Sequence, residues 1–352
     1  MTIKYLGPLL LAFGLAEGCT MHRPLEFNSE SYPKKIVFTP GSGSMFSASC
    51  YEGESQIADN AESSENEEAL VFLRKRDGRA LWIDVGQNER PDAVTMNMQL
   101  IMNYAGAGDI IIAYHTHPTP GLPTQKDYAM HALMKKEFGK VGATVYPGYV
   151  LMRDKKKDIY LYEFEGFEDE KGKVTGRQRP CNALDNLDSK PAKVVTTPGA
   201  GKIFSASQID GENALFNQLA SGEIDCEDAF MYVERAFGGS FWADVGKDET
   251  PEGVNNDMGV AMKCLRKGDV VKFYHIHPGS QEQPSALDYN AHGIKKDTLK
   301  KWGIETRKSV VICPDALLEY EGGTEETVGG RKLTTGVSMK ILRTKAATRP
   351  RQ

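Results

Sequence analysis

Cysteine is scarce in this sequence, and no two cysteines form a metal-binding pair. The six cysteines occupy positions 19, 50, 181, 226, 264 and 313, so none belongs to a C-x-x-C motif. This spacing excludes a zinc ribbon, which holds its metal with such pairs. A dense disulfide framework is not supported either. Five cysteines remain if Cys19 is modified, and an odd number leaves one thiol free.

A hydrophobic run long enough to cross a membrane is also missing. The longest apolar stretch covers residues 5–16, whereas a helix needs about 20 residues to span a bilayer. Lys4 precedes this stretch, and the Ala-Glu-Gly-Cys segment at 16–19 that follows it resembles a bacterial lipoprotein cleavage site. We therefore predict that 1–19 is an export signal and that the exported protein is either anchored to a membrane by a lipid on Cys19 or periplasmic. The alternative is a cytoplasmic protein with a frayed N-terminal helix or strand.

An excess of positive charge is absent as well. Lys and Arg number 43 against 48 Asp and Glu, which gives a net charge of −5. Proteins that bind nucleic acid present a basic surface to the phosphates. The composition therefore argues against a nucleic-acid partner.

What the sequence does contain is an internal repeat. Four blocks recur in order at offsets of 158 to 161 residues: 35–49 with 193–207, 82–86 with 242–246, 115–118 with 275–278, and 127–131 with 288–292. Chance does not produce four ordered matches at a nearly constant spacing. We predict two homologous domains, at 35–168 and 193–344, joined by a polar linker at 169–192. Within the first, the polar segment 52–68 is expected to form a loop or the frayed start of a helix.

Each copy mixes expected strands with expected helices. In the second copy, strands are predicted at 241–245, 270–277, 310–313 and 317–320, and helices at 255–265 and 285–302. Such a mixture indicates an α/β or α+β sandwich.

The histidines concentrate at equivalent positions of the repeat. Six of the seven stand at 115 and 275, 117 and 277, and 131 and 292. Residues two apart in a strand face the same side, so His275 and His277 present both imidazoles together. Asp288 follows Ser285, an expected helix N-cap, and therefore lies in the first helical turn. Two imidazoles and one carboxylate form a zinc set that leaves a fourth position for water, as catalytic zinc sites do.

The spacing of these residues resembles a known signature. His275-x-His277, seven residues, then Ser285-x-x-Asp288 is similar to the motif of the JAMM (MPN+, JAB-like) zinc metalloproteases. The resemblance implies two JAMM/cytidine-deaminase-like sandwich domains, each a mixed sheet flanked by helices. It implies that His275, His277 and Asp288 bind zinc. It also implies that Ser285 polarises the substrate carbonyl or stabilises the oxyanion.

The family also uses a glutamate as the base toward the zinc-bound water. Our candidate is Glu234, which precedes the apolar segment 241–245. Glu212, Glu223 and Glu227 are alternatives that the sequence leaves open. A solvated surface charge is the ordinary state of a glutamate and competes with each of these interpretations.

The first copy retains the candidate ligands His115, His117 and Asp127. The loop before Asp127 is one residue shorter than its counterpart, and Thr124 stands in place of the serine. These residues form a second candidate zinc set.

The first copy differs at the expected base. Arg74 aligns with Glu234, and a guanidinium cannot act as a base near neutral pH. We therefore expect the first copy to be a degenerate, inactive scaffold, unless Glu67 or Glu68 supplies the base.

Two further matched pairs have a structural and a functional interpretation. His131 and His292 lie four residues after the candidate ligand aspartates, on the same helix face, and either orient those carboxylates, donate a proton to the leaving group or pack in the core. Asp84 and Asp244 end a predicted strand, where capping of a turn is favoured over catalysis.

These residues predict a zinc-dependent metallopeptidase or isopeptidase-type amide hydrolase that acts on a protein or peptide. The alternative is a non-catalytic, metal-binding scaffold of the same kind. A third interpretation, a RadC-like nucleic-acid protein, fits poorly with the acidic composition and the expected export signal. The oligomeric state is not indicated by the sequence.

Overall fold

The computed structural model describes most of the chain, namely residues 24–25, 31–38, 41–118, 121–153, 159–181, 190–197, 199–279, 283–322, 325–328, 331–334 and 338–344. The expected export signal and Cys19 lie outside these ranges, so lipid attachment stays a prediction. Within them, the structure contains no helix with the length and apolar character needed to span a membrane.

The first half of the chain forms one sheet with three helices. The sheet contains β1 (Met45–Phe46), β2 (Ala69–Arg74), β3 (Ala80–Asp84), β6 (Ile110–His117), β7 (Thr144–Val145), β8 (Gly148–Arg153), β9 (Ile159–Glu168) and β10 (Val174–Cys181). The helices are α1 (Cys50–Ser63), α2 (Met98–Tyr104) and α3 (Gln125–Lys140), and β4 (Gly86–Arg90) pairs with β5 (Ala93–Met96) as a separate hairpin.

The second half repeats this plan. Its sheet contains β11 (Ile203–Phe204), β12 (Ala229–Glu234), β13 (Ser240–Asp244), β16 (Val270–Ile276), β17 (Glu305–Thr306), β18 (Ser309–Ile312), β19 (Ala316–Glu321) and β22 (Ser338–Thr344). The helices are α4 (Gln208–Ala220), α5 (Met258–Cys264) and α6 (Ala286–Lys300). Two hairpins are added: β14 (Gly246–Thr250) with β15 (Gly253–Asn256), and β20 (Glu325–Val328) with β21 (Arg331–Thr334).

The two eight-stranded sheets have corresponding strand orders. The first runs β1-β3-β2-β6-β8-β9-β10 and the second β11-β13-β12-β16-β18-β19-β22. In each, the central strand pairs antiparallel on one side and parallel on the other, as β16 does with β12 and β18. The chain is therefore of the mixed α+β class that the sequence predicts.

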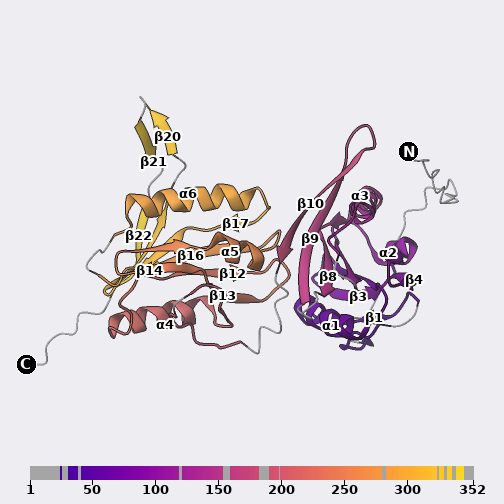
Figure 1. Ribbon diagram of the computed structural model, residues 1–352, viewed down its shortest axis with the longest axis horizontal. Helices are drawn as coiled ribbons and strands as arrows, with labels where there is room; N and C mark the ends of the chain where they lie inside the picture. Colours follow the sequence, from indigo (N-terminus) through magenta and orange to yellow (C-terminus); the bar gives the residue numbers. More distant parts are fainter. Residues whose placement is uncertain are drawn as a thin grey trace, which may run out of the picture.

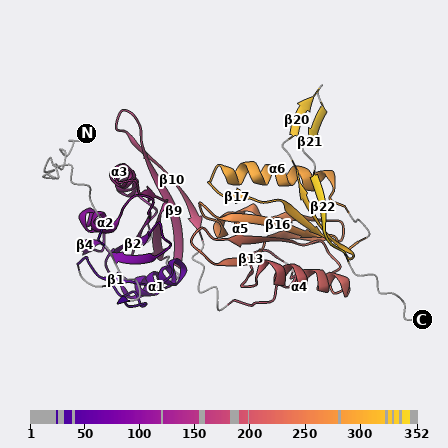
Figure 2. The same cartoon turned by 180° about the vertical axis from the view of Figure 1, so that it is seen from behind.

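Helices cover both faces of each sheet (Figure 1, Figure 2). In the second half, α4 packs on one face through Leu215 and Leu219, and α5 and α6 pack on the other through Ala261 and Leu299. The strands supply both cores because alternate residues point to opposite faces. In β12, Ala229, Met231 and Val233 face the α6 side, whereas Phe230 and Tyr232 face the α4 side.

The predicted linker at 169–192 is wrong for residues 174–181, which form β10. This strand pairs with β9 from Val174 opposite Glu168 to Cys181 opposite Leu161. Its charged side chains are satisfied within the hairpin: Arg177 binds Glu165 at 2.6 Å and Arg179 binds Glu163 at 2.9 Å. Because ion pairs replace the usual apolar alternation, the sequence pattern does not indicate a strand.

The segment 52–68 is also better ordered than expected. Most of it belongs to α1, whose N-cap Ser49 forms a capping box with Glu52. The helix lies against the first sheet, and a Cβ at Gly53 would come within 2.1 Å of the Trp82 ring. The absence of a side chain at position 53 therefore lets this polar helix pack closely.

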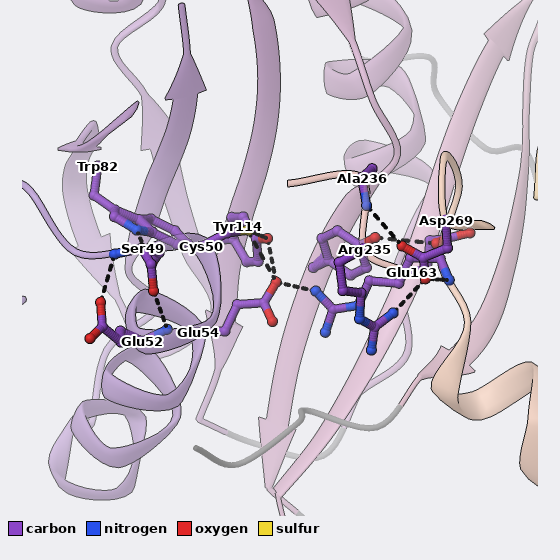
Figure 3. A network of polar contacts seen from close by, with 12 residues as sticks. Ser49, Cys50, Glu52, Glu54, Trp82, Tyr114, Glu163, Arg235, Ala236 and Asp269 are labelled. Atoms are coloured by element: carbon purple, nitrogen blue, oxygen red, sulfur yellow. Dashed lines mark hydrogen bonds and ion pairs between the residues drawn. The ribbon is translucent and has the colours of Figure 1, made fainter. Parts of the chain in front are cut away.

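A buried polar network joins the two halves (Figure 3). Glu54 of α1 points toward the second half and forms an ion pair with Arg266. Arg74 donates to the carbonyl of Ala236 at 2.8 Å, and Arg179 donates to that of Met262 at 2.9 Å. Arg74 therefore has a structural role between the halves.

Candidate metal centres

The two histidines of the second half extend the α6-facing side of β16. Val271 and Phe273 of this strand belong to the α6-side core, and alternation carries His275 and His277 to the same side. The backbone N–H of His277 donates to Ile312 at 2.9 Å and keeps the chain extended past the end of β16. The Nε2 atoms of His275 and His277 consequently lie 3.0 Å apart.

Asp288 reaches the histidines from the first turn of α6. Its Oδ1 lies 3.3 Å from Nε2 of His275, and its Oδ2 lies 3.9 Å from Nε2 of His277. Ser285 caps the helix, and its hydroxyl donates to Asp288 Oδ2 at 2.7 Å. Burial by itself would raise the pKa of Asp288. The hydrogen bond and charge of His275, with the bonds from Ser285, outweigh burial and hold that pKa below its usual range.

A glutamate completes the cluster, and it is Glu227. This residue lies two positions before Ala229 of β12, so both side chains face α6. Ala229 is paired with His275 on the neighbouring strand, which places Glu227 beside the histidines. Glu227 Oε1 lies 3.8 Å from Nε2 of His277. Burial, followed by the charge of Asp288, raises the pKa of Glu227 to about 7, a value suited to proton transfer near neutral pH.

The prediction of Glu234 as the base is wrong. Glu234 lies opposite Val270, five positions along β12 from the pair Ala229–His275, which corresponds to about 16 Å of strand. Its carboxylate instead forms an exposed bidentate ion pair with Arg307, at 2.8 Å for both bonds. Glu234 therefore lies at the end of β12 that is far from the histidines.

The two other glutamates that the sequence left open are engaged elsewhere. Glu212 of α4 accepts the hydroxyl of Tyr274 at 2.6 Å, and Tyr274 belongs to the core on the opposite face of the sheet from the histidines. Glu223 accepts the hydroxyl of Ser221 at 3.0 Å.

The first half holds the same arrangement. The Nε2 atoms of His115 and His117 lie 3.1 Å apart, and Asp127 Oδ1 lies 3.2 Å from the former. Thr124 replaces Ser285 without loss of the contact, since its hydroxyl donates to Asp127 Oδ2 at 2.8 Å. Glu67 Oε1 lies 3.9 Å from Nε2 of His117, as Glu227 does from His277 in the second half.

This geometry removes the reason to call the first copy degenerate. That prediction compared Arg74 with Glu234, and neither residue lies at a histidine cluster. The glutamates that lie beside the histidines are Glu67 and Glu227, which occupy matched positions of the repeat. The first half therefore carries as complete a set of side chains as the second.

Zinc fits both clusters. His117 Nδ1 lies 2.7 Å from the carbonyl of Gly121. A carbonyl only accepts, so this nitrogen carries the proton and Nε2 of the neutral ring presents a lone pair. That lone pair faces His115 and Glu67, an arrangement that a cation stabilises. Two ligands of a tetrahedral zinc lie about 3.3 Å apart, close to the nitrogen separations in both halves.

Comparisons with protein-family models, curated proteins and solved structures found no match to this chain. The interpretation of both centres therefore rests on the chemistry of their side chains.

The remaining matched residues have structural contacts. His131 accepts the N–H of Gly166 at 3.2 Å and donates to the carbonyl of Tyr146 at 2.9 Å. His292 contacts the hydroxyl of Ser309 at 2.8 Å. Asp244 accepts the N–H of Gly246 at 3.1 Å, the hydrogen bond that a turn-capping role predicts. These contacts favour a structural role for His131 and His292.

Each centre opens into a cavity of about 420 Å³, and the two cavities differ in lining. The cavity beside His115 is lined by apolar side chains that include Val94, Met96, Met130, Met134 and Phe164. The cavity beside His275 has a mixed lining, in which Asn255, Asn256, Asn290 and Lys295 stand beside apolar side chains such as Met258 and Leu287. The two centres therefore have the same histidine, aspartate and glutamate side chains and differ in the residues that line the cavity beside them.

Proposed function

We propose that this chain is a zinc-dependent amide hydrolase of the JAMM type, with one active centre in each half. The observation that carries the proposal is the convergence, in both halves, of two imidazole nitrogens, an aspartate and a half-buried glutamate. His275, His277 and Asp288 would hold one zinc ion, and His115, His117 and Asp127 the other. Zinc, when bound, supplies a Lewis acid and lowers the pKa of a water molecule to about 7.

The glutamates move the proton in this proposal. Glu227 lies on the same side of the sheet as the histidines, with Oε1 near the point where the ligand atoms meet. It takes a proton from the attacking water and returns it to the leaving amine. Glu67 does the same in the first half, where burial raises its pKa above the usual value for glutamate.

Ser285 and Thr124 orient the ligand aspartates. The hydroxyl of Ser285 donates to Asp288 Oδ2 and accepts the N–H of Asp288, at 2.7 and 3.2 Å. A hydroxyl has one hydrogen. The oxyanion role that the resemblance implies for Ser285 therefore requires that this bond be exchanged for one to the substrate.

The linings of the cavities suggest different substrates for the two centres. Met96, Met130 and Phe164 favour an apolar side chain in the first half. Lys295 and the surrounding asparagines favour a polar or acidic one in the second. Since the sequence predicts export, we propose envelope proteins, cell-wall peptides or a secreted protein as the source of these amide bonds.

The proposal is tested with the zinc-loaded chain and a library of peptides. Glu67→Gln and Glu227→Gln keep the size of each side chain and remove the base. The double variant should retain zinc and lose turnover by about 10²–10⁴-fold, the usual worth of general acid–base catalysis. Glu234→Gln is the matched control, because Glu234 is a surface glutamate away from both centres, and its turnover should equal that of the wild type.

Two results contradict the proposal in different ways. Full turnover in the Glu67→Gln/Glu227→Gln chain shows that these glutamates are not the bases. A wild-type chain that binds zinc and cleaves no peptide of the library supports the alternative, a metal-binding scaffold without catalysis.

A further inference from the structure

The start of β12 separates two side-chain clusters on opposite faces of the second sheet. Glu227 faces the histidines, and the next residue, Asp228, faces the other way because successive residues alternate. There the carboxylate oxygens of Asp228, Asp244 and Glu249 lie within 4.8 Å of one another. Asp228 is 4% exposed and Asp244 is fully buried. The proposed hydrolysis uses none of these three residues.

Backbone N–H groups hold each of the three carboxylates in place. One oxygen of each accepts a single such bond: Asp228 from Ala229 at 2.7 Å, Asp244 from Gly246 at 3.1 Å, and Glu249 from Gly199 at 3.1 Å. Gly246 also leaves room for the cluster, since a Cβ there would come within 2.3 Å of Asp228 Oδ1. The carboxylates are therefore fixed close together by the backbone, although their charges repel.

Lys202 is the basic residue whose charge offsets that of Asp244, but within the described part of the chain no ion pair joins it to the cluster. No hydrogen bond of good geometry reaches Oδ2 of the fully buried Asp244 among the described residues, although the hydroxyl of Thr197 lies near enough to stabilise this carboxylate. A buried carboxylate oxygen without a well-placed partner is unfavourable, and a bound cation would supply that partner.

We propose that Asp228, Asp244 and Glu249 bind a calcium ion. Calcium prefers oxygen ligands at 2.3–2.6 Å, so oxygens on opposite sides of the ion lie up to about 5 Å apart, which matches the spread of this cluster. Zinc, in contrast, favours nitrogen and sulfur ligands. A cavity of about 290 Å³, lined by Thr197, Asp228 and Glu249 among others, connects the cluster with solvent and gives the ion a path.

The first half provides a matched comparison. Glu68, Asp84 and Glu89 occupy the equivalent positions. The longer Glu68 side chain contacts the hydroxyl of Ser64 at 3.4 Å. Among the described residues, the carboxylate oxygens of Asp228, Asp244 and Glu249 lie close enough together to hold a cation. Those of the first-half residues do not. We therefore assign the calcium site to the second half alone.

Equilibrium dialysis of the zinc-loaded chain against calcium chloride tests the proposal. The wild type should bind one calcium per chain, with a Kd between about 10⁻⁷ and 10⁻³ M, the range of sensor and extracellular sites. Asp244→Asn keeps the bond from Gly246 and removes one charge, and it should weaken binding by about tenfold or more. Glu249→Gln, at a less buried position, should weaken it likewise and guards against a folding defect in the first variant.

Asp84→Asn is the control and should bind calcium as the wild type does. His275→Ala/His277→Ala should also retain calcium, which separates this site from the zinc centre. The proposal is overturned if the wild type takes up no calcium at millimolar concentration. It is equally overturned if folded Asp244→Asn and Glu249→Gln chains bind calcium as tightly as the wild type.

Discussion

If the chain binds zinc as proposed, its two pairs of imidazoles determine how many ions it holds. We expect two zinc ions per wild-type chain, because each half brings two imidazole nitrogens and a carboxylate together. Replacing His275 and His277 by alanine should leave one zinc ion, and so should replacing His115 and His117. The measurement is the metal content of each purified chain by elemental analysis after dialysis.

The chain with all four of these histidines replaced should bind no zinc. Zinc retained by that chain would place the metal elsewhere. A wild type with a single zinc ion, lost on replacement of His275 and His277, would restore the expectation that the first half is degenerate.

At the scale of residues, the sequence was sufficient to bring the candidate ligands together and insufficient to select the glutamate that lies beside them. His275 and His277 are two apart in a strand, so their common face follows from strand geometry alone. Choosing a glutamate required the register of β12 against β16, which pairs Ala229 with His275. One signal was available: Glu67 and Glu227 are matched in the repeat, as the histidines are, whereas Glu234 is matched by Arg74.

Among the elements, α3 and β9 approach closely because Gly166 has no side chain. A Cβ at Gly166 would lie 1.9 Å from the backbone oxygen of Tyr128 in α3, so the helix itself would have to move. We expect Gly166→Ala to lower the free energy of unfolding by about 1–3 kcal/mol or more. It should also weaken zinc binding by the first half, since α3 carries Asp127. Urea denaturation and zinc titration measure the two effects.

Gly139 in the same helix is the control for this variant. A Cβ there meets no atom within 4 Å, and alanine is favoured over glycine inside a helix by about 0.5–1 kcal/mol. Gly139→Ala should therefore stabilise the protein slightly and leave zinc binding unchanged. Equal stability of the two variants would show that α3 and β9 are not in close contact.

Helices and strands were predictable where their pattern is periodic or capped. The expected helices at 255–265 and 285–302 correspond to α5 and α6. The strand β10 was missed because Arg177 and Arg179 satisfy their charges against β9, a pairing that no local pattern reveals. The helix α1 was underestimated because its packing depends on Gly53 beside Trp82, a contact between distant residues.

For the whole molecule, the contact between the halves depends on buried charge. Arg266 and Glu54 form an ion pair with side chains that are 6% and 1% exposed. Tyr114 donates to the same Glu54 oxygen at 2.5 Å, and Arg266 also lies over the ring of Tyr149, 5.0 Å from its centroid. Arg266 belongs to the second half, and Glu54, Tyr114 and Tyr149 belong to the first. Unfolding of either half therefore leaves Arg266 or Glu54 without its oppositely charged partner.

This coupling predicts the response to Glu54→Gln. The substitution keeps the shape of the side chain but leaves the guanidinium of Arg266 buried without its counter-charge. Breaking a buried pair in this way costs about 3–5 kcal/mol. We expect a loss of stability of that size in urea denaturation, and a single wild-type transition should separate into two as the halves unfold independently. Glu234→Gln is the matched control, because its ion pair with Arg307 is exposed and such pairs contribute about 0–1 kcal/mol. If both variants unfold as the wild type does, the halves are not coupled through Arg266.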